Sequence, residues 1–112
     1  MAYNPIVIPH PERNEIRLEG VLHALSDPVR LRIARELAEA GGERSCGSFE
    51  CAVTKSTMTH HFKVLREAGV IRQRQEATLR LTSLRRDDLD ARFPGLLERI
   101  LEAAQDEAPI AA

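Results

Sequence analysis

The chain has 112 residues, of which 43% are hydrophobic and 29% charged, a composition typical of one globular domain with a modest core. Only 4% of the residues are aromatic, so aliphatic side chains must supply that core. No apolar run reaches the roughly 20 residues that span a bilayer, and the N-terminus does not resemble a signal peptide. The sequence therefore predicts a cytoplasmic protein without a membrane partner.

The formal net charge of −1 is unevenly distributed along the chain. Residues 1–53 carry six Lys and Arg against eight Asp and Glu (−2), and residues 87–112 carry two against seven (−5). Residues 54–86 carry eight against two (+6). A basic block inside a nearly neutral protein is typical of a polyanion-binding face. By charge alone, a solvated surface without a partner is an equally good interpretation.

The first segments in chain order are an arm and two helices. Pro5, Pro9 and Pro11 predict a flexible, extended arm over residues 1–13. A second helix is expected to follow the N-cap residue Asp27 and to stop at the glycine pair 41–42. Residues 43–53 predict only a loop and one short helix. The first helix is expected over 14–25, between the arm and the second helix, because apolar side chains recur there at helical spacing: Leu18, Val21, Leu22 and Leu25.

The second half of the chain predicts a helix, a hairpin and a final helix. Thr54 is a suitable cap for a helix over 55–68, and Gly69 suits the left-handed residue that ends it. Residues 70–84 change to the two-residue period of a β-hairpin. The last helix is interrupted at Pro94-Gly95, and residues 107–112 form a tail. Residues 14–106 thus predict one domain, mainly α with a β-hairpin wing.

The stretch STMTHHFKVLREAGVI, residues 56–71, contains a histidine doublet on the predicted basic helix. Adjacent helical side chains point about 100° apart, so His60 and His61 belong to different faces and are not expected to share a metal ion. No other metal site and no cofactor is predicted. One face carries Ser56, Thr59, His60 and Lys63, and the other carries Met58, His61, Phe62 and Leu65.

The two faces predict different roles. The first is short, rich in hydroxyls and cationic, and Lys55 and Thr57 adjoin it in the first turn. Such side chains can lie close to a DNA groove and contact base edges and phosphates. His61 is expected to be a buried histidine with a hydrogen-bond partner. A basic helix followed directly by a basic hairpin is typical of a winged helix-turn-helix.

The segments ALSDPVRLRIARELAEAG and KSTMTHHFKVLREAGVI resemble the ArsR-type (arsenic-repressor) family of winged helix-turn-helix regulators, over roughly residues 18–84. The resemblance implies a homodimeric repressor that binds a pseudo-palindromic double-stranded operator and is released by an inducer, which the sequence does not identify. It assigns DNA contact to Ser56, Thr57, Thr59, His60 and Lys63, beside Lys55, and it places Arg72, Arg74 and Arg80 in or beside the wing. Relatives often carry glycine in the wing turn, where this chain has residues 75–78.

Cys46 and Cys51 lie where metal-sensing relatives usually carry a Cys-x-Cys pair. On a continuous helix these two side chains would point about 140° apart, and the chain has no third thiolate for a soft metal. Three interpretations stay open. The thiols are structural, with Cys51 buried and Cys46 exposed, or they sense oxidants or persulfides, or they sense a metal or metalloid.

The predicted last helix carries more apolar surface than so small a domain easily buries. Leu96, Leu97, Ile100 and Leu101 are expected to be exposed in a monomer. The predicted dimer interface joins the first and last helices through Leu18, Leu22, Phe93, Leu96, Leu97, Ile100 and Leu101.

The alternative function is a protein-interaction module without sequence-specific DNA binding, which the position of the basic block disfavours. An enzyme is not expected, because the sequence lacks a nucleophile–base set and a glycine-rich phosphate loop.

Overall fold

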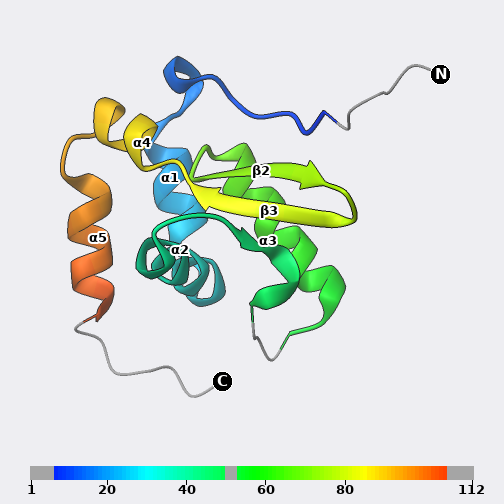
Figure 1. The fold of residues 1–112 in the computed structure, drawn as a ribbon. Coiled ribbons are helices and arrows are strands. Elements are labelled where there is room, and N and C mark those ends of the chain that lie inside the picture. The colour runs from blue at the N-terminus through cyan, green and yellow to red at the C-terminus, as the bar shows by residue number, and fades with distance from the viewer. Residues whose placement is uncertain (1–6, 50–52, 106–112) are drawn as a thin grey trace.

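The computed structural model describes residues 7–49 and 53–105, which are mainly helical with one small antiparallel sheet (Figure 1). The elements are a 3₁₀ turn η1 (Arg13–Glu15), α1 (Leu18–Leu25), α2 (Pro28–Ala40), β1 (Arg44–Ser45), a 3₁₀ turn η2 (Cys46–Ser48), α3 (Lys55–Glu67), β2 (Ile71–Glu76), β3 (Leu79–Leu84), α4 (Arg86–Arg92) and α5 (Leu96–Gln105). Helix α3 packs against β2, α4 follows β3 at the base of the hairpin, and α5 stands beside α2. The predicted architecture, mainly α with a β-hairpin, is confirmed.

The core is aliphatic, as the composition predicts. Ile33 and Leu37 of α2, Leu65 of α3 and Ile71 of β2 are at most 2% exposed. Most of the free energy that favours folding comes from removing such apolar surface from water. Aromatic packing adds one edge-to-face pair, Phe49 with Phe62, whose ring centroids lie 5.4 Å apart.

Helices α2 and α3 begin as the sequence predicts. The Asp27 carboxylate accepts the N–H groups of Val29 at 2.8 Å and Arg30 at 3.2 Å, so it satisfies donors that the first turn leaves unpaired. The Thr54 hydroxyl accepts the N–H of Thr57 at 3.2 Å in the same way. Both predicted N-caps are confirmed.

Glycines end the same two helices. Gly41, with φ of 72°, ends α2, and Gly69, with φ of 84°, follows α3. The N–H of Val70 donates to the Leu65 carbonyl at 3.0 Å, which is the hydrogen bond of a Schellman cap. A Cβ atom on Gly69 would lie 2.5 Å from Cγ1 of Ile16, so this position requires glycine for space as well as for conformation.

The start of the first helix is a correction. The sequence predicted a helix from about Asn14, but α1 begins at Leu18 and only the 3₁₀ turn η1 precedes it. Ile16 lies between them, extended and 1% exposed, against Gly69. The packing of this one side chain interrupts the helix, and helical periodicity does not reveal it.

The hairpin pairs Ile71 with Leu84 at its base and Glu76 with Leu79 at its tip. Ala77 in the two-residue turn has φ of 52°, the conformation in which glycine is unstrained. Strand β1 pairs with β3 as a third strand where only a loop and a short helix were predicted for 43–53. Two residues are too few to show a strand period. In the described part of residues 43–53, the 3₁₀ turn η2 stands where the short helix was predicted.

Helix α4 ends at Arg92 and α5 starts at Leu96, so the predicted interruption at Pro94-Gly95 is confirmed. The predicted exposure of the last helix is partly wrong. Leu97 and Leu101 are 3% and 7% exposed because α5 packs against α2 within the same chain. Leu96 and Ile100 are half-buried.

The segment predicted as a flexible arm lies, from residue 7 onward, against the outer edge of β2 (Figure 1). His10 accepts a hydrogen bond from the wing, the Pro11 carbonyl accepts one from Arg85 between β3 and α4, and Arg13 donates one to α4. These residues are therefore part of the packed structure and do not extend away from it.

Candidate nucleic-acid interface

The polar face of α3 is exposed along its first half. The side chains singled out by the sequence all lie there, and all are exposed: Lys55, Ser56, Thr57, Thr59, His60 and Lys63. The Thr57 hydroxyl is within 2.9 Å of the Thr54 hydroxyl, and Thr59 donates its hydroxyl hydrogen to the Lys55 carbonyl at 3.0 Å. Thr59 thus keeps its oxygen lone pairs and its methyl group for an outside partner.

The histidine doublet separates as predicted. His60 is exposed, whereas His61 is 7% exposed and belongs to the core side with Phe62 and Leu65. Nη1 of Arg30 lies 3.3 Å from Nδ1 of His61, while the Asp27 carboxylate is farther from that nitrogen, at 4.0 Å. Nδ1 must be unprotonated to accept from Arg30. Burial lowers the pKa of His61, and Arg30 lowers it further against the opposing effect of Asp27, so the ring is neutral.

Arg30 positions α3 in a way that the sequence reasoning missed. Its side chain is buried, and it donates from Nε to the Ala24 carbonyl at 2.7 Å and from Nη2 to the His23 carbonyl at 3.3 Å. It therefore hydrogen-bonds to carbonyls at the end of α1 while it contacts His61 of α3. The available signal was its spacing, because Arg30 falls on the same helical stripe as Ile33 and Leu37.

The two strands of the hairpin divide the wing arginines between opposite faces. Gln75 is paired with Arg80 and Arg74 with Leu81, so Arg80 lies on the face opposite Arg72 and Arg74. The face with Arg80 is that of Gln73, whose side-chain oxygen accepts from Nη1 of Arg66 on α3 at 2.7 Å. The sequence grouped the three arginines together, but only Arg80 lies on the sheet face turned toward α3.

Arg74 is bound by two carboxylates. Its Nε and Nη2 donate to Glu43 at 2.7 and 2.8 Å, and Nη2 is also 3.0 Å from Glu76. The hydrogen bonds to Glu43 hold the pKa of Arg74 above its ordinary value. A phosphate that contacts Arg74 must therefore compete with Glu43.

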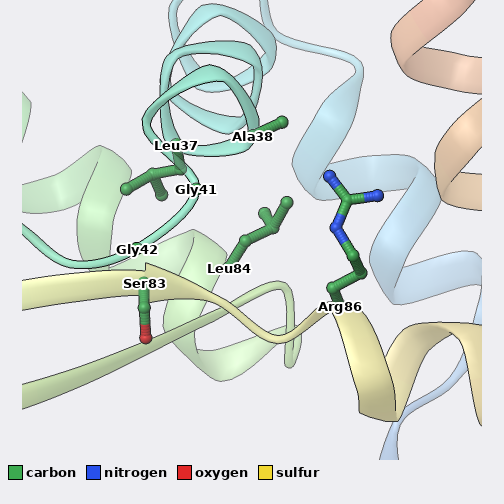
Figure 2. Close-up of a pocket in the computed structure, with 7 residues that line it drawn as sticks. All are labelled: Leu37, Ala38, Gly41, Gly42, Ser83, Leu84 and Arg86. Atoms are coloured by element: carbon green, nitrogen blue, oxygen red, sulfur yellow. The ribbon is translucent and has the colours of Figure 1, made fainter.

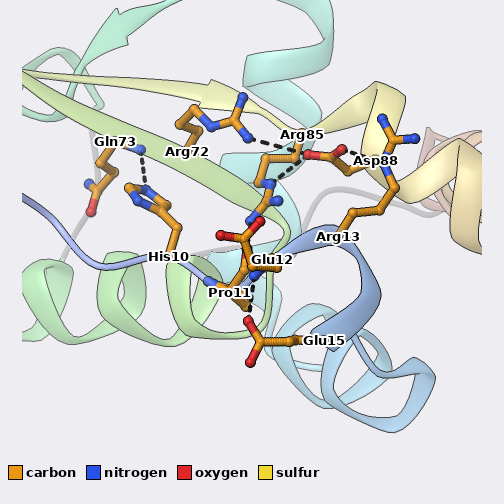
Figure 3. A network of polar contacts seen from close by, with 9 residues as sticks. All are labelled: His10, Pro11, Glu12, Arg13, Glu15, Arg72, Gln73, Arg85 and Asp88. Carbon is orange, nitrogen blue, oxygen red and sulfur yellow. Dashed lines mark hydrogen bonds and ion pairs between the residues drawn. The ribbon is translucent and has the colours of Figure 1, made fainter.

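A polar network under the wing joins α3, the sheet and the arm. The Gln73 amide donates to Thr82 and to the sulfur of Cys46, each at 3.2 Å. The backbone N–H of Gln73 donates to Nε2 of His10 at 2.9 Å (Figure 3). Nδ1 of His10 lies 2.7 Å from the Ile8 carbonyl, so Nδ1 carries the proton and the ring is neutral.

Of the two cysteines, Cys46 is the one that the structure describes. Cys46 is half-buried, in contact with Thr82 at 3.1 Å, where the structural interpretation placed an exposed thiol. Its position beside β3 explains the difference. Cys51 lies outside the described residues. Across 7–49 and 53–105, no three His, Cys, Asp or Glu side chains gather closely enough to hold a metal ion.

A small cavity lies between the end of α2 and β3, lined by Leu37, Ala38, Gly41, Gly42, Ser83, Leu84 and Arg86 (Figure 2). Its volume of about 160 Å³ is below the roughly 300 Å³ of ordinary ligand pockets. Its polar side chains, Ser83 and Arg86, have no histidine or carboxylate beside them in the lining. This cavity holds no catalytic constellation. No helix in the described part of the chain is long and apolar enough to span a membrane.

The known proteins that this chain resembles are transcriptional regulators. A family model described as a helix-turn-helix domain matches residues 25–74. The HTH-type transcriptional regulator YceK of Bacillus subtilis is 40% identical over 89 residues, which cover 78% of this chain and 88% of YceK. The biofilm growth-associated repressor of Agrobacterium fabrum is 35% identical over 74 residues, covering 64% of this chain and 62% of that protein.

Solved structures show the same fold. The transcriptional repressor BigR from Xylella fastidiosa matches with a TM-score of 0.61 and 26% identity, over 82% of this chain and 88% of that one. An ArsR family transcriptional regulator matches with a TM-score of 0.59 and 21% identity, over 81% and 93% of the two chains. The exposed polar helix next to a hairpin agrees with these relatives. The chain belongs to the ArsR-type family of winged helix-turn-helix, DNA-binding transcriptional regulators.

Proposed function

We propose that the protein acts in the cytoplasm as a homodimeric repressor that binds a pseudo-palindromic operator and leaves it when an inducer binds. The single observation that carries the proposal is the exposed, cationic, hydroxyl-rich first half of α3 beside the wing. The names of two relatives, the biofilm growth-associated repressor and BigR, support repression as the direction of regulation.

Sequence readout is proposed for the first half of α3. Thr59 and His60 are exposed on the polar face, and they offer a methyl group, hydroxyl lone pairs and an imidazole to base edges in the major groove. Lys55 and Lys63 lie at the two ends of this surface and would contact phosphates on either side. Ser56 and Thr57, in the first turn, would receive a phosphate near the positive end of the helix dipole.

The wing would contribute backbone contacts through Arg80, which shares the α3 side of the sheet, and through Arg74 after displacement of Glu43. Arg72 is not part of this proposed surface. It lies at the base of the hairpin and donates to Asp88 at 3.3 Å.

The dimer is proposed to form through α1 and α5. Leu18 and Leu22 of α1 are 43% and 46% exposed, and a partner would cover them. Phe93, Leu96 and Ile100 are half-buried and would complete the interface, whereas Leu97 and Leu101 already belong to the core of one chain. Two α3 helices separated by about 34 Å, one turn of DNA, then require a two-fold related site.

The experiment that tests this function is a selection of bound sequences from random double-stranded DNA, with the oligomeric state measured by light scattering. We expect a two-fold symmetric motif and a dimer. His60→Ala should change the selected motif, while Arg99→Gln, on the exposed side of α5, should not. A parent protein that selects no motif, or a monomer with full affinity, would contradict the proposal. Repeating the selection with oxidant or metal ions tests the cysteines as sensors.

A further inference from the structure

Three arginines from different segments meet at the base of the hairpin (Figure 3). Arg13 belongs to the turn η1, Arg72 to β2, and Arg85 precedes α4. All three donate to one carboxylate, that of Asp88. Its Oδ1 accepts from Nε of Arg13 at 2.7 Å, and its Oδ2 accepts from Arg85 at 2.9 Å and from Arg72 at 3.3 Å.

This arrangement leaves positive charge uncompensated. Three guanidinium groups share the Asp88 carboxylate, and with the Asp87 carboxylate nearby the local formal charge is +1. The Arg85 side chain is 3% exposed and that of Asp88 is 15% exposed, so solvent screens the charges of this pair poorly, whereas Arg13 and Arg72 are open to solvent. The neighbouring Arg86 is paired with Glu98 of α5 at 3.2 Å and adds little to the excess.

The arginines line a cavity of about 300 Å³ together with Leu84, Arg86, Asp87 and Asp88. The side chains of Arg13 and Arg72 are 55% and 57% exposed above it. Each uses one nitrogen on Asp88, and within the described ranges their other N–H groups have no partner. The open guanidinium groups of Arg13 and Arg72 therefore border the cavity, and the buried guanidinium group of Arg85 lies beneath them.

We propose that this cavity is a binding site for a small phosphoryl oxyanion, held between Arg13 and Arg72. Guanidinium forks match the paired oxygens of a phosphoryl group, and its negative charge would offset the local positive excess. A monocarboxylate has only two oxygens, which fill one guanidinium fork and leave the other open. The volume admits a phosphoryl group with a small attached moiety.

The source of the phosphoryl group is a free anion and not the DNA backbone. The cavity lies beside α4 at the base of the hairpin, whereas the exposed face of α3 starts at the opposite end of the molecule (Figure 1). A bound anion would join the arm, β2 and the start of α4. Since Arg72 adjoins Gln73, which bonds to Arg66 of α3, the anion would also act on the wing and α3. That last effect rests on the proposed DNA binding; the binding of the anion does not.

The test is calorimetric titration of the full chain with inorganic phosphate and pyrophosphate, without DNA, at constant chloride concentration, with acetate as the single-charge comparison. We expect one saturable site per chain for the phosphates. Arg13→Gln and Arg72→Gln should each weaken it at least about tenfold, the loss typical of one charge-assisted contact. The matched control is Arg17→Gln, which removes an exposed arginine that pairs with Glu19 and lies outside the cavity.

The proposal is overturned if the parent shows no saturable binding, or if the control weakens binding as much as the two cavity variants do. Melting temperatures measured with and without pyrophosphate verify folding and give a second readout, because a ligand of the native state raises the melting temperature. DNA affinity is measured separately. If Arg72→Gln weakens binding to every DNA sequence while the parent ignores free phosphates, the cavity belongs to the DNA interface and the free-anion site is wrong.

Discussion

Helix α3 and the wing both present cations, but they hold them differently. Lys55 and Lys63 extend from α3 with no ion-pair partner in the described part of the chain. In the wing, Arg74 is bound by both Glu43 and Glu76. A count of basic residues therefore overstates the charge that the wing offers to DNA. We therefore expect α3 to supply most of the affinity for DNA, and the carboxylates around the wing to adjust that affinity.

The largest effect is expected at the junction of the two regions. Gly69→Ala should destabilise the fold by about 2–4 kcal/mol, because it adds left-handed strain to a clash with Ile16. Gly41→Ala has the same kind of positive φ but open space around it, and should cost about 1 kcal/mol or less. Urea denaturation measures both. Equal losses in the two variants would mean that the close approach of Ile16 to Gly69 contributes nothing.

The next effect concerns α3. Replacing Lys55 and Lys63 together with glutamine should weaken binding to all DNA sequences, by about tenfold for each lysine lost, and should reduce the salt slope by about two for each protomer bound. Arg74→Gln should lower affinity less, since its charge is already shared with two carboxylates. Fluorescence anisotropy at several salt concentrations distinguishes these results. If Arg74→Gln proves the more damaging, the contrast between the regions fails.

Acidification should loosen both regions through His61 under α3 and His10 beside the wing. The pKa of each is lowered, first by burial, so the folded protein favours the neutral rings. The contribution of the two neutral rings to the free energy of unfolding is then fully present above the ordinary histidine pKa of about 6.5. It declines as the pH falls below that value, because the unfolded chain binds protons that the folded protein does not. Urea midpoints at pH 7.5 and 5.5 measure the decline. His61→Asn keeps an acceptor for Arg30 and should reduce it; an unchanged parent midpoint would refute the assignment.

A smaller gain is expected from Glu43→Gln. The change releases one of the two carboxylates that bind Arg74, so affinity for DNA should rise, by no more than about fivefold for an exposed ion pair. Glu39→Gln on the exposed end of α2 alters the net charge equally and serves as the control. A similar rise in both variants would attribute the gain to net charge alone.

The smallest effect concerns the tip of the wing. Ala77→Gly should stabilise the protein by about 0.5 kcal/mol, because relief of the strain at φ of 52° exceeds the added flexibility of the unfolded chain. Thr78→Gly, next to it and without a positive φ, should destabilise instead. Thermal melts compare the two, and a loss in both variants would rule out strain at Ala77.

Local chemistry made part of this molecule predictable from sequence. Caps at Asp27 and Thr54 and a left-handed glycine at 69 are decided by neighbours within four residues, and these predictions are confirmed. The division of α3 into two faces follows from helical spacing, and the burial of His61 and exposure of His60 confirm it. The sequence places the DNA-contacting residues on an exposed face, but the contacts themselves stay a prediction.

Other features depend on residues that are distant in the chain. The partner of Arg74 is Glu43, 31 residues away, and the partner of Gln73 is His10, 63 residues away. No spacing rule joins such pairs, so neither the neutralised wing arginine nor the docked arm was foreseen. Burial of Leu97 and Leu101 likewise depends on how α5 meets α2.

The position of the arm has a consequence for handling the protein. With the order β1-β3-β2, β2 is an outer strand, and His10 covers the N–H of Gln73 that faces away from β3. Unpaired outer strands recruit other chains into intermolecular sheets. A shortened version that starts at α1 would expose this strand and tend to aggregate, so residues 7–17 protect the solubility of the domain behind them.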